Sequence, residues 1–151
     1  MSVQGESIHA TALIVGAQGV LIRGASGAGK SRLALALLAG APLRGDFARL
    51  IGDDRVRLTC ASGRVIVSGH GAVAGLIERR GSGLESAAHE AGAVVHLVVD
   101  LVETIERLPD TVALKTVLLG VELARLALAS SAPPTQKCAD VLARLEAIRR
   151  R

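Results

Sequence analysis

The fold is decided by a glycine-rich stretch at residues 24–31, which reads Gly24-Ala25-Ser26-Gly27-Ala28-Gly29-Lys30-Ser31. It matches the pattern G-x-x-x-x-G-K-S, in which the backbone N–H groups of the loop surround a phosphate. Residues 20–23 form an apolar run typical of a buried strand, and residues 32–39 are rich in strong helix formers. We therefore expect a P-loop, with Lys30 contacting the β- and γ-phosphates of a nucleotide and the Ser31 hydroxyl binding Mg²⁺. The alternative, a glycine-rich turn that ends in Lys-Ser, is disfavoured by the flanking strand and helix.

Composition narrows the class of protein. The 151 residues fit a single domain over residues 1–151, and because Phe47 is the only aromatic residue, the core must be aliphatic. No apolar run is long enough to span a bilayer and no signal-peptide pattern is present, so no membrane association is expected. Cys60 and Cys138 fit no metal or redox motif, which favours a reduced, cytoplasmic location. The net charge of +4 comes without a nucleic-acid-binding motif, so nucleic acid is not an expected partner.

The remaining sequence predicts an α/β domain. Short apolar or alternating runs indicate strands, and longer runs of helix formers indicate helices. We expect strands at residues 8–15, 20–23, 50–52, 55–60, 64–68 and 94–101, and helices at residues 32–39, 84–92, 117–129 and 138–149. Residues 40–45 are expected to end the first helix, and residues 76–83 and 103–110 are expected to be loops.

Two adjacent acids, Asp53 and Asp54, follow the apolar residues 50–52. Many P-loop enzymes present carboxylates to Mg²⁺ or to an attacking nucleophile from such a position, although a turn with two solvated acids is the alternative. Neighbouring side chains of an extended segment point to opposite sides, so we do not expect the two acids to share one role.

Several stretches, in the same order, resemble the catalytic domain of HPr kinase/phosphorylase. Enzymes of this family phosphorylate a serine of HPr, the small phosphocarrier of the sugar phosphotransferase system, and can remove that phosphate by phosphorolysis. The P-loop, the Asp-Asp pair and the Ile-Glu-x-Arg-Gly-x-Gly segment together make the resemblance specific. The matching stretches are Ser-Ile-His at residues 7–9, the P-loop, Gly-Asp-Asp-Arg-Val at 52–56, Ile-Glu-Arg-Arg-Gly-Ser-Gly at 77–83, Val-Val-Asp-Leu at 98–101 and Arg-Leu at 107–108.

The resemblance implies a P-loop nucleotide-binding domain of the HPr kinase type, with a mixed sheet and flanking helices. It implies ATP and Mg²⁺ as cofactors, HPr or an HPr-like phosphocarrier as partner, and a hexamer. Lys30 would bind phosphate, Ser31 with Glu78 would hold Mg²⁺, and Asp54 would accept the serine proton. The other implied roles are His9 as an active-site residue near the phosphates, Asp53 as support for Asp54, and Arg107 as a group that stabilises the transferred phosphoryl group.

The sequence also departs from the family pattern. The family's N-terminal domain is not found, as in its short form, and Arg79, Ser82 and Glu106 replace the usual residues. The late Pro-Val-Lys-x-Gly-Arg-Asn segment, which is tied to dephosphorylation, is not recognisable, and Lys115 is its only match. We therefore expect kinase activity to exceed phosphorolysis. A small-molecule kinase, a nucleotide-sensing module without phosphotransfer, and pyrophosphate rather than ATP as the donor remain alternatives.

Overall fold

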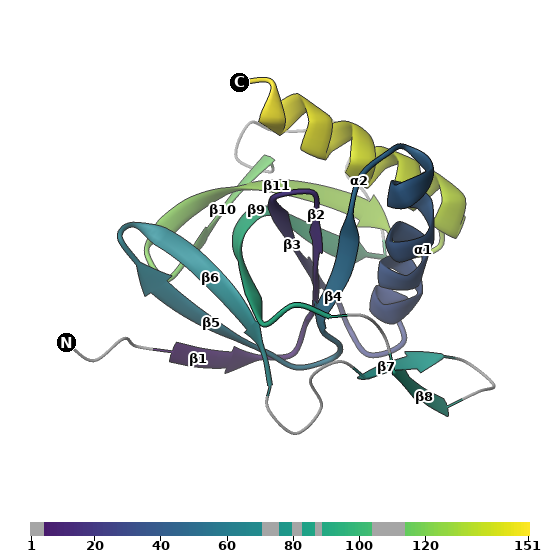
Figure 1. The fold of residues 1–151 in the computed structure, drawn as a ribbon, viewed down its shortest axis with the longest axis horizontal. Helices are drawn as coiled ribbons and strands as arrows, with labels where there is room; N and C mark the ends of the chain where they lie inside the picture. The colour runs from purple at the N-terminus through teal and green to yellow at the C-terminus, as the bar shows by residue number, and fades with distance from the viewer. Residues whose placement is uncertain (1–4, 71–75, 80–82, 87–88, 104–113) are drawn as a thin grey trace.

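The computed structural model describes residues 5–70, 76–79, 83–86, 89–103 and 114–151, and it shows a curled mixed sheet with both helices packed on one side (Figure 1). The predicted α/β class, with a mixed sheet and flanking helices, is confirmed. In chain order the elements are β1 (Gly5–Ile8), β2 (Thr11–Val15), β3 (Gln18–Arg23), α1 (Lys30–Leu43), β4 (Ala48–Gly52), β5 (Val56–Ala61), β6 (Arg64–Gly69), β7 (Leu76–Arg79), β8 (Gly83–Ser86), β9 (Gly92–Val102), β10 (Lys115–Leu118), β11 (Val121–Ala129) and α2 (Pro134–Arg149).

Strand β9 is the centre of the large sheet. The strand order is β1-β5-β6-β9-β3-β2-β4, β11 also pairs with β9, and β10 pairs with β11. β9 is 11 residues long, so its first residues can pair with β6 while its later residues pair in parallel with β3 and β11. Strands β7 and β8 form a separate hairpin, which lies near the start of α1 (Figure 1).

Four strands end at the same edge of the sheet. β3, β9 and β11 are parallel, and β4 runs in their direction because β2 is antiparallel to both β3 and β4. The P-loop follows β3, Asp53 and Asp54 follow β4, and the turn into α2 follows β11. β2 starts at this edge, since Thr11 lies opposite Ile22. The carboxyl edge of an α/β sheet is where ligands bind, so the topology gathers the predicted site there.

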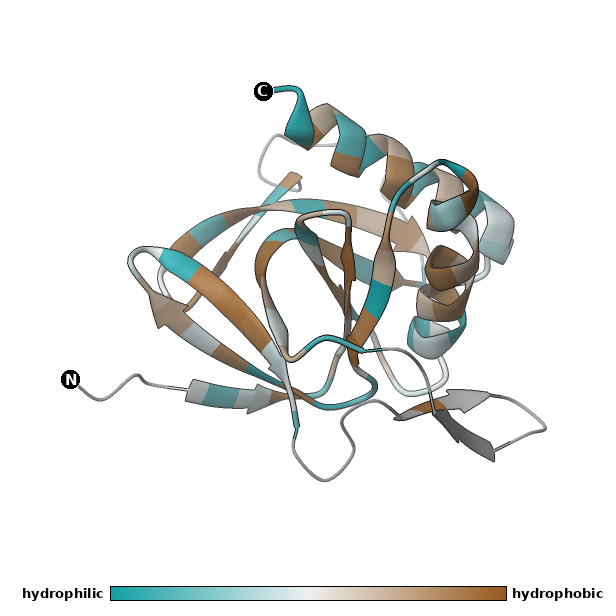
Figure 2. Ribbon diagram, viewed as in Figure 1, coloured by the Kyte–Doolittle hydropathy of each residue, from teal (hydrophilic) through white to brown (hydrophobic). Residues whose placement is uncertain are grey.

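Aliphatic side chains form a core cluster on each face of the sheet. Figure 2 shows hydrophobic residues along the strands and along both helices. In β3, Val20 and Ile22 belong to the cluster that includes residues of α1 and α2, whereas Leu21 belongs to the cluster on the other face. Residues along a strand alternate between faces, and a strand covered on both faces reads as a nearly continuous apolar run. The expected aliphatic core is thus present, and Phe47, the single aromatic residue, is 45% exposed.

The prediction of a helix at residues 117–129 was wrong. This segment is the β10–β11 hairpin, and its turn is made by Leu119 and Gly120, both at positive φ (50° and 78°). Two-residue turns with positive φ suit the twist of a hairpin. Leu and Ala are strong helix formers, but parallel pairing of β11 with β9 overrides that preference.

Two smaller predictions were also wrong, and a third was confirmed. Strands β7 (Leu76–Arg79) and β8 (Gly83–Ser86) form a hairpin, so the described residues of the loop expected at 76–83 and the start of the helix expected at 84–92 are strands. The helix stop expected within residues 40–45 is present, since α1 continues through Gly40, ends at Leu43 and is followed by Arg44 as its C-cap. A β-carbon at Gly40 would lie 3.0 Å from Cys138 Sγ, so the missing side chain lets α1 and α2 approach closely. Finally, residues 8–15 are two strands interrupted at His9 and Ala10.

Candidate phosphate-binding and catalytic site

The loop at residues 24–31 has the backbone of a phosphate cradle. Gly27 and Gly29 have φ of 81° and 101°, which residues with side chains rarely adopt, and a β-carbon at Gly27 would meet no atom within 4 Å. A β-carbon at Gly24 would lie 3.2 Å from those of Ala28 and Leu101, so the loop packs closely against the end of β9. Gly24 therefore allows the loop to pack closely against β9, while the space next to Gly27 is free of protein atoms.

Lys30 is the first residue of α1 and is only 5% exposed. Its Nζ donates hydrogen bonds to the carbonyl oxygens of Gly24 at 2.9 Å and Ala25 at 3.2 Å, so the ammonium group lies over the loop. The first turn of α1 has no acidic residue and no side-chain cap, which leaves the partial positive charge of the helix N-terminus uncompensated there. The cation and the helix end together favour an anion in the loop.

Asp53 is a buried carboxylate directed at the P-loop. Its Oδ1 accepts a hydrogen bond from Ser31 Oγ at 2.6 Å and another from Thr11 Oγ1 at 2.8 Å, and the residue is 7% exposed. Thr11 is fully buried and also accepts the N–H of Asp54 at 3.1 Å. Sequence reasoning missed Thr11, whose only signal is its place two residues after His9 at the start of a strand.

Asp54 lies in a different environment from Asp53. Its Oδ1 is 2.5 Å from His9 Nε2, and the two side chains are 65% and 48% exposed. The two acids thus face different partners, but the reason differs from the one expected. Asp54 has a φ of 64°, in the left-handed region, so the backbone bends here instead of continuing as an extended segment.

A second charged cluster connects the end of β3, which leads into the P-loop, to β9 and β11. Arg23 contacts both carboxylate oxygens of Asp100 at 2.8 and 2.9 Å, and Arg125 Nε contacts Oδ2 at 2.5 Å. Burial of Asp100 acts to raise its pKa, but the hydrogen bonds and charges of both arginines outweigh burial and hold the pKa below its usual range. Sequence reasoning gave none of these residues a role.

The donor groups fit a magnesium ion. A hydroxyl at Ser31 and a carboxylate at Asp53 are hard oxygen ligands in contact with each other, and Mg²⁺ commonly takes one or two protein oxygens with water and phosphate oxygens as the rest. No group of three or more His, Cys, Asp or Glu side chains with metal-binding geometry occurs in the described part of the chain. The Glu78 side chain and Arg107 lie outside the described residues.

These features define a P-loop domain equipped for phosphoryl transfer: a phosphate cradle, a metal-compatible pair and an exposed carboxylate at one sheet edge. The family model for the HPr serine kinase C-terminal domain matches residues 2–129, and the chain belongs to that family. The predicted resemblance is therefore confirmed. In the part of the chain that the structure describes, no helix is both long and apolar enough to cross a membrane.

Two relatives support the assignment. An HPr kinase/phosphorylase from Mycoplasma mycoides subsp. mycoides SC is 39% identical over 102 residues, which cover 63% of this chain and 31% of that protein. The chain thus matches about a third of the length of that relative. The solved structure of the Hpr(Ser) kinase/phosphatase from Coxiella burnetii superposes with a TM-score of 0.74 at 26% identity, covering 93% of this chain and 97% of the other.

Proposed function

We propose that this domain is a serine kinase that transfers the γ-phosphoryl group of ATP to HPr or an HPr-like phosphocarrier. The observation that carries the proposal is Asp54, a carboxylate held by His9 beside the buried Asp53–Ser31 contact. With its side chain 65% exposed, Asp54 can be reached by a serine on the surface of another folded protein. A base that serves a small molecule is more often enclosed, because small ligands are largely buried in their sites.

The proposed roles follow from these positions. Asp54 accepts the proton of the serine hydroxyl while the bond from that oxygen to the γ-phosphorus forms and the bond to the ADP oxygen breaks. His9 holds the Asp54 carboxylate in place, and Lys30 offsets charge on the phosphates. Arg107 would stabilise the transferred group, as the family resemblance implies.

Mg²⁺ would be held by Ser31, by Glu78 as the resemblance implies, and by Asp53, which the structure places against Ser31. When bound, the ion neutralises charge on the phosphate oxygens and orients them. The assignment of Asp53 extends the role expected from sequence, because a residue that only supports Asp54 has no need to contact the P-loop hydroxyl.

The test is transfer of label from γ-labelled ATP to purified HPr in the presence of Mg²⁺, with Lys30→Met as the inactive control. Phosphoserine on HPr that depends on Lys30 supports the proposal. Binding of ATP without transfer to HPr would indicate a nucleotide-sensing module, and transfer to a small alcohol would indicate a small-molecule kinase. Labelling of HPr from pyrophosphate and not from ATP would show that pyrophosphate is the phosphate donor.

We also propose that the forward reaction exceeds phosphorolysis, because the late segment tied to dephosphorylation is not recognisable in the sequence. We further propose that the protein is a hexamer, as the family resemblance implies. Phosphoserine-HPr mixed with inorganic phosphate should release pyrophosphate more slowly than ATP phosphorylates HPr under matched conditions. Sedimentation of the purified chain measures the assembly directly, and a monomer at micromolar concentration would contradict the hexamer.

A further inference from the structure

A cavity lies next to the P-loop on the side of helix α2. Its volume is about 360 Å³, within the range of small-ligand sites. One wall is made by the P-loop residues Gly27 and Gly29 and by Arg32, and the other by residues 130–134 and Lys137. The wall from α2 is present because β11 ends at the same sheet edge as β3, so the chain enters α2 beside the loop.

Lys137, in the first turn of α2, is a buried cation in this wall. It is 3% exposed, and its Nζ would lie 3.7 Å from a β-carbon built on Gly29. Among the described residues, Nζ donates one hydrogen bond, to the Ser130 carbonyl at 2.9 Å, which leaves two of its three N–H groups for another acceptor.

The charge around this cavity is positive. In the described part of the chain no carboxylate pairs with Lys137 or Arg32, and the first turns of both α1 and α2 lack acidic residues. Burial lowers the pKa of Lys137 and the nearby charge of Arg32 lowers it further. Proteins rarely bury a cation without a compensating anion, so this arrangement suits an anionic ligand.

We propose that Lys137 and Arg32 form a second anion subsite beside the P-loop. When the P-loop holds one phosphate of a di- or triphosphate donor, this subsite binds the next phosphate of the same molecule. The proposal rests on the proposed nucleotide-dependent function and adds a positioning residue from α2. It also predicts selectivity: ligands with two or more linked phosphates use both subsites, whereas inorganic phosphate uses the P-loop alone.

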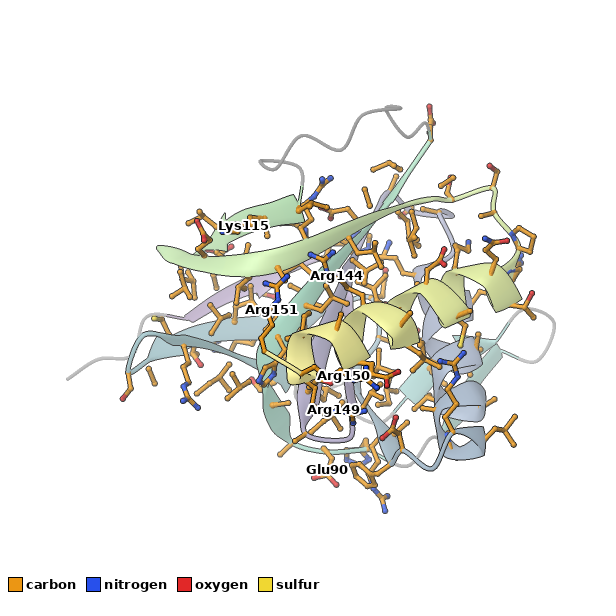
Figure 3. The ribbon with its side chains drawn as sticks, turned by 90° about the horizontal axis from the view of Figure 1, so that it is seen from above. Glu90, Lys115, Arg144, Arg149, Arg150 and Arg151 are labelled. Atoms are coloured by element: carbon orange, nitrogen blue, oxygen red, sulfur yellow. The ribbon has the colours of Figure 1, made fainter. Side chains whose placement is uncertain are left out.

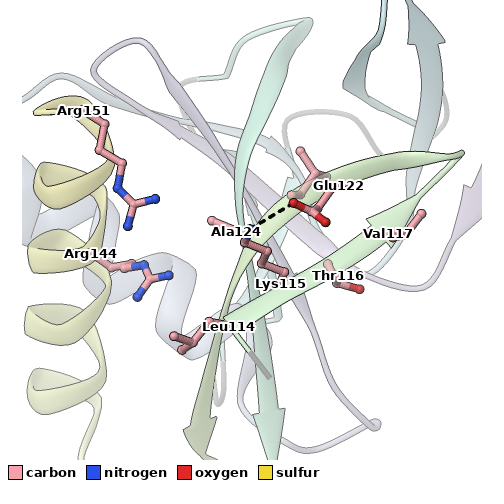
Figure 4. A pocket seen from close by; sticks show the side chains of 9 residues that line it. Leu114, Lys115, Thr116, Val117, Glu122, Ala124, Arg144 and Arg151 are labelled. Carbon is pink, nitrogen blue, oxygen red and sulfur yellow. Dashed lines mark ion pairs between the residues drawn. The ribbon is translucent and has the colours of Figure 1, made fainter. Parts of the chain in front are cut away.

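A second, larger cavity of about 670 Å³ does not share these properties. It lies between the β10–β11 hairpin and the C-terminal end of α2 (Figures 3 and 4). Lys115 there is 60% exposed and already paired with Glu122 at 3.1 Å. Arg144 in α2 and Arg151, which follows α2, extend towards the hairpin (Figure 4), and neither residue lines the first cavity. Lys115 therefore provides a matched control for loss of one positive charge.

The experiment is calorimetric binding of ADP, pyrophosphate and inorganic phosphate to the wild-type protein and to Lys137→Gln, Lys137→Met, Arg32→Gln and Lys115→Gln. We expect Lys137→Gln and Lys137→Met to weaken ADP and pyrophosphate binding by roughly 10- to 100-fold, the range for loss of a charged hydrogen bond. Arg32→Gln should act in the same direction but less, because Arg32 is exposed. Phosphate binding should stay within about twofold, and Lys115→Gln should match the wild type for all three ligands.

Glutamine separates this role from a structural one. Its amide can still donate to the Ser130 carbonyl, so a purely structural Lys137 predicts normal ligand binding for Lys137→Gln and weaker binding only for Lys137→Met. Normal ADP affinity in Lys137→Gln, or an equal loss for ADP and inorganic phosphate, would overturn the proposal. If Lys137→Met fails to fold, Lys137→Gln and the exposed Arg32→Gln still decide. Because the readout is binding, failure of HPr phosphorylation would refute the proposed function and leave this inference standing.

Discussion

Two carboxylate clusters lie at the same edge of the sheet, and their surroundings differ. Asp100 is 12% exposed at its side chain and contacts two arginines, so its charge is fully engaged. Asp54 is 65% exposed, and its ion-pair partner among the described residues is a histidine, His9. A carboxylate whose pKa is lowered by two guanidinium groups is a poor proton acceptor, whereas Asp54 remains available to a substrate. The comparison separates a cluster that supports the P-loop from one that can do chemistry.

The largest effect should come from Asp54→Asn. An amide keeps the shape of the side chain but cannot accept the serine proton, so kcat for HPr phosphorylation should fall by roughly 10²–10⁴. ADP affinity, measured by calorimetry, should not change, because Asp54 faces His9 instead of the loop. Asp140→Asn on the exposed face of α2 is the control. A near-normal kcat in Asp54→Asn would remove the distinction between the two clusters.

Asp100→Asn should instead act on stability. The substitution leaves two arginines without their anion, and we expect the unfolding free energy to fall by about 2–3 kcal/mol. This is less than the ~3–5 kcal/mol expected when one partner of a fully buried ion pair is removed, because both arginines are partly exposed. The pKa of Asp100 is lowered in the folded state, so its contribution is present above the unfolded pKa and is lost as pH falls through the folded value.

Urea unfolding at two pH values checks the sign. The difference in unfolding free energy between wild type and Asp100→Asn should be largest near pH 7 and should shrink below about pH 4. A difference that is the same at pH 7 and pH 3 would show that the charge of Asp100 does not stabilise the fold.

Thr11→Val tests the link between the two acids. Valine has nearly the same shape but removes the hydroxyl that donates to Asp53 and accepts from Asp54 N–H. We expect a loss of about 1–2 kcal/mol in unfolding free energy, because the buried Asp53 carboxylate loses a hydrogen-bond donor. kcat should fall as well, since the backbone at Asp54 has a φ of 64° and the Thr11 hydroxyl is one of the contacts that hold it. Thr11→Ser, which keeps the hydroxyl, should restore kcat; a Thr11→Ser variant as impaired as Thr11→Val would point to packing alone.

The smallest effect should come from Arg23→Lys. Lysine keeps the charge but lacks the planar guanidinium that contacts both carboxylate oxygens of Asp100. We therefore expect the unfolding free energy to fall by about 1 kcal/mol. Thermal unfolding measures the change, and nucleotide affinity should fall only slightly because Arg23 directly precedes the loop. A loss as large as that of Asp100→Asn would mean that Arg125 contributes little to the cluster.

Much of the candidate site could be read from short segments. The P-loop and the Asp-Asp pair carry their chemistry within a few consecutive residues, and Lys30, Ser31, Asp53, Asp54 and His9 do lie together at one sheet edge. The elements that were mispredicted are those whose state depends on distant partners. Residues 117–129 have the composition of a helix, and only pairing with β9 makes them strands.

The sequence by itself determined the glycine-rich loop before α1, the pair of acids and the family, because these depend on residue types at fixed local spacing. The tertiary structure decided which groups from elsewhere join them. Thr11 reaches Asp53 across 42 residues of sequence and Arg23 reaches Asp100 across 77, while Lys137 reaches the P-loop because β11 ends at the same sheet edge as β3. Such contacts have no local signature, since they arise from strand order and direction, which long-range pairing sets.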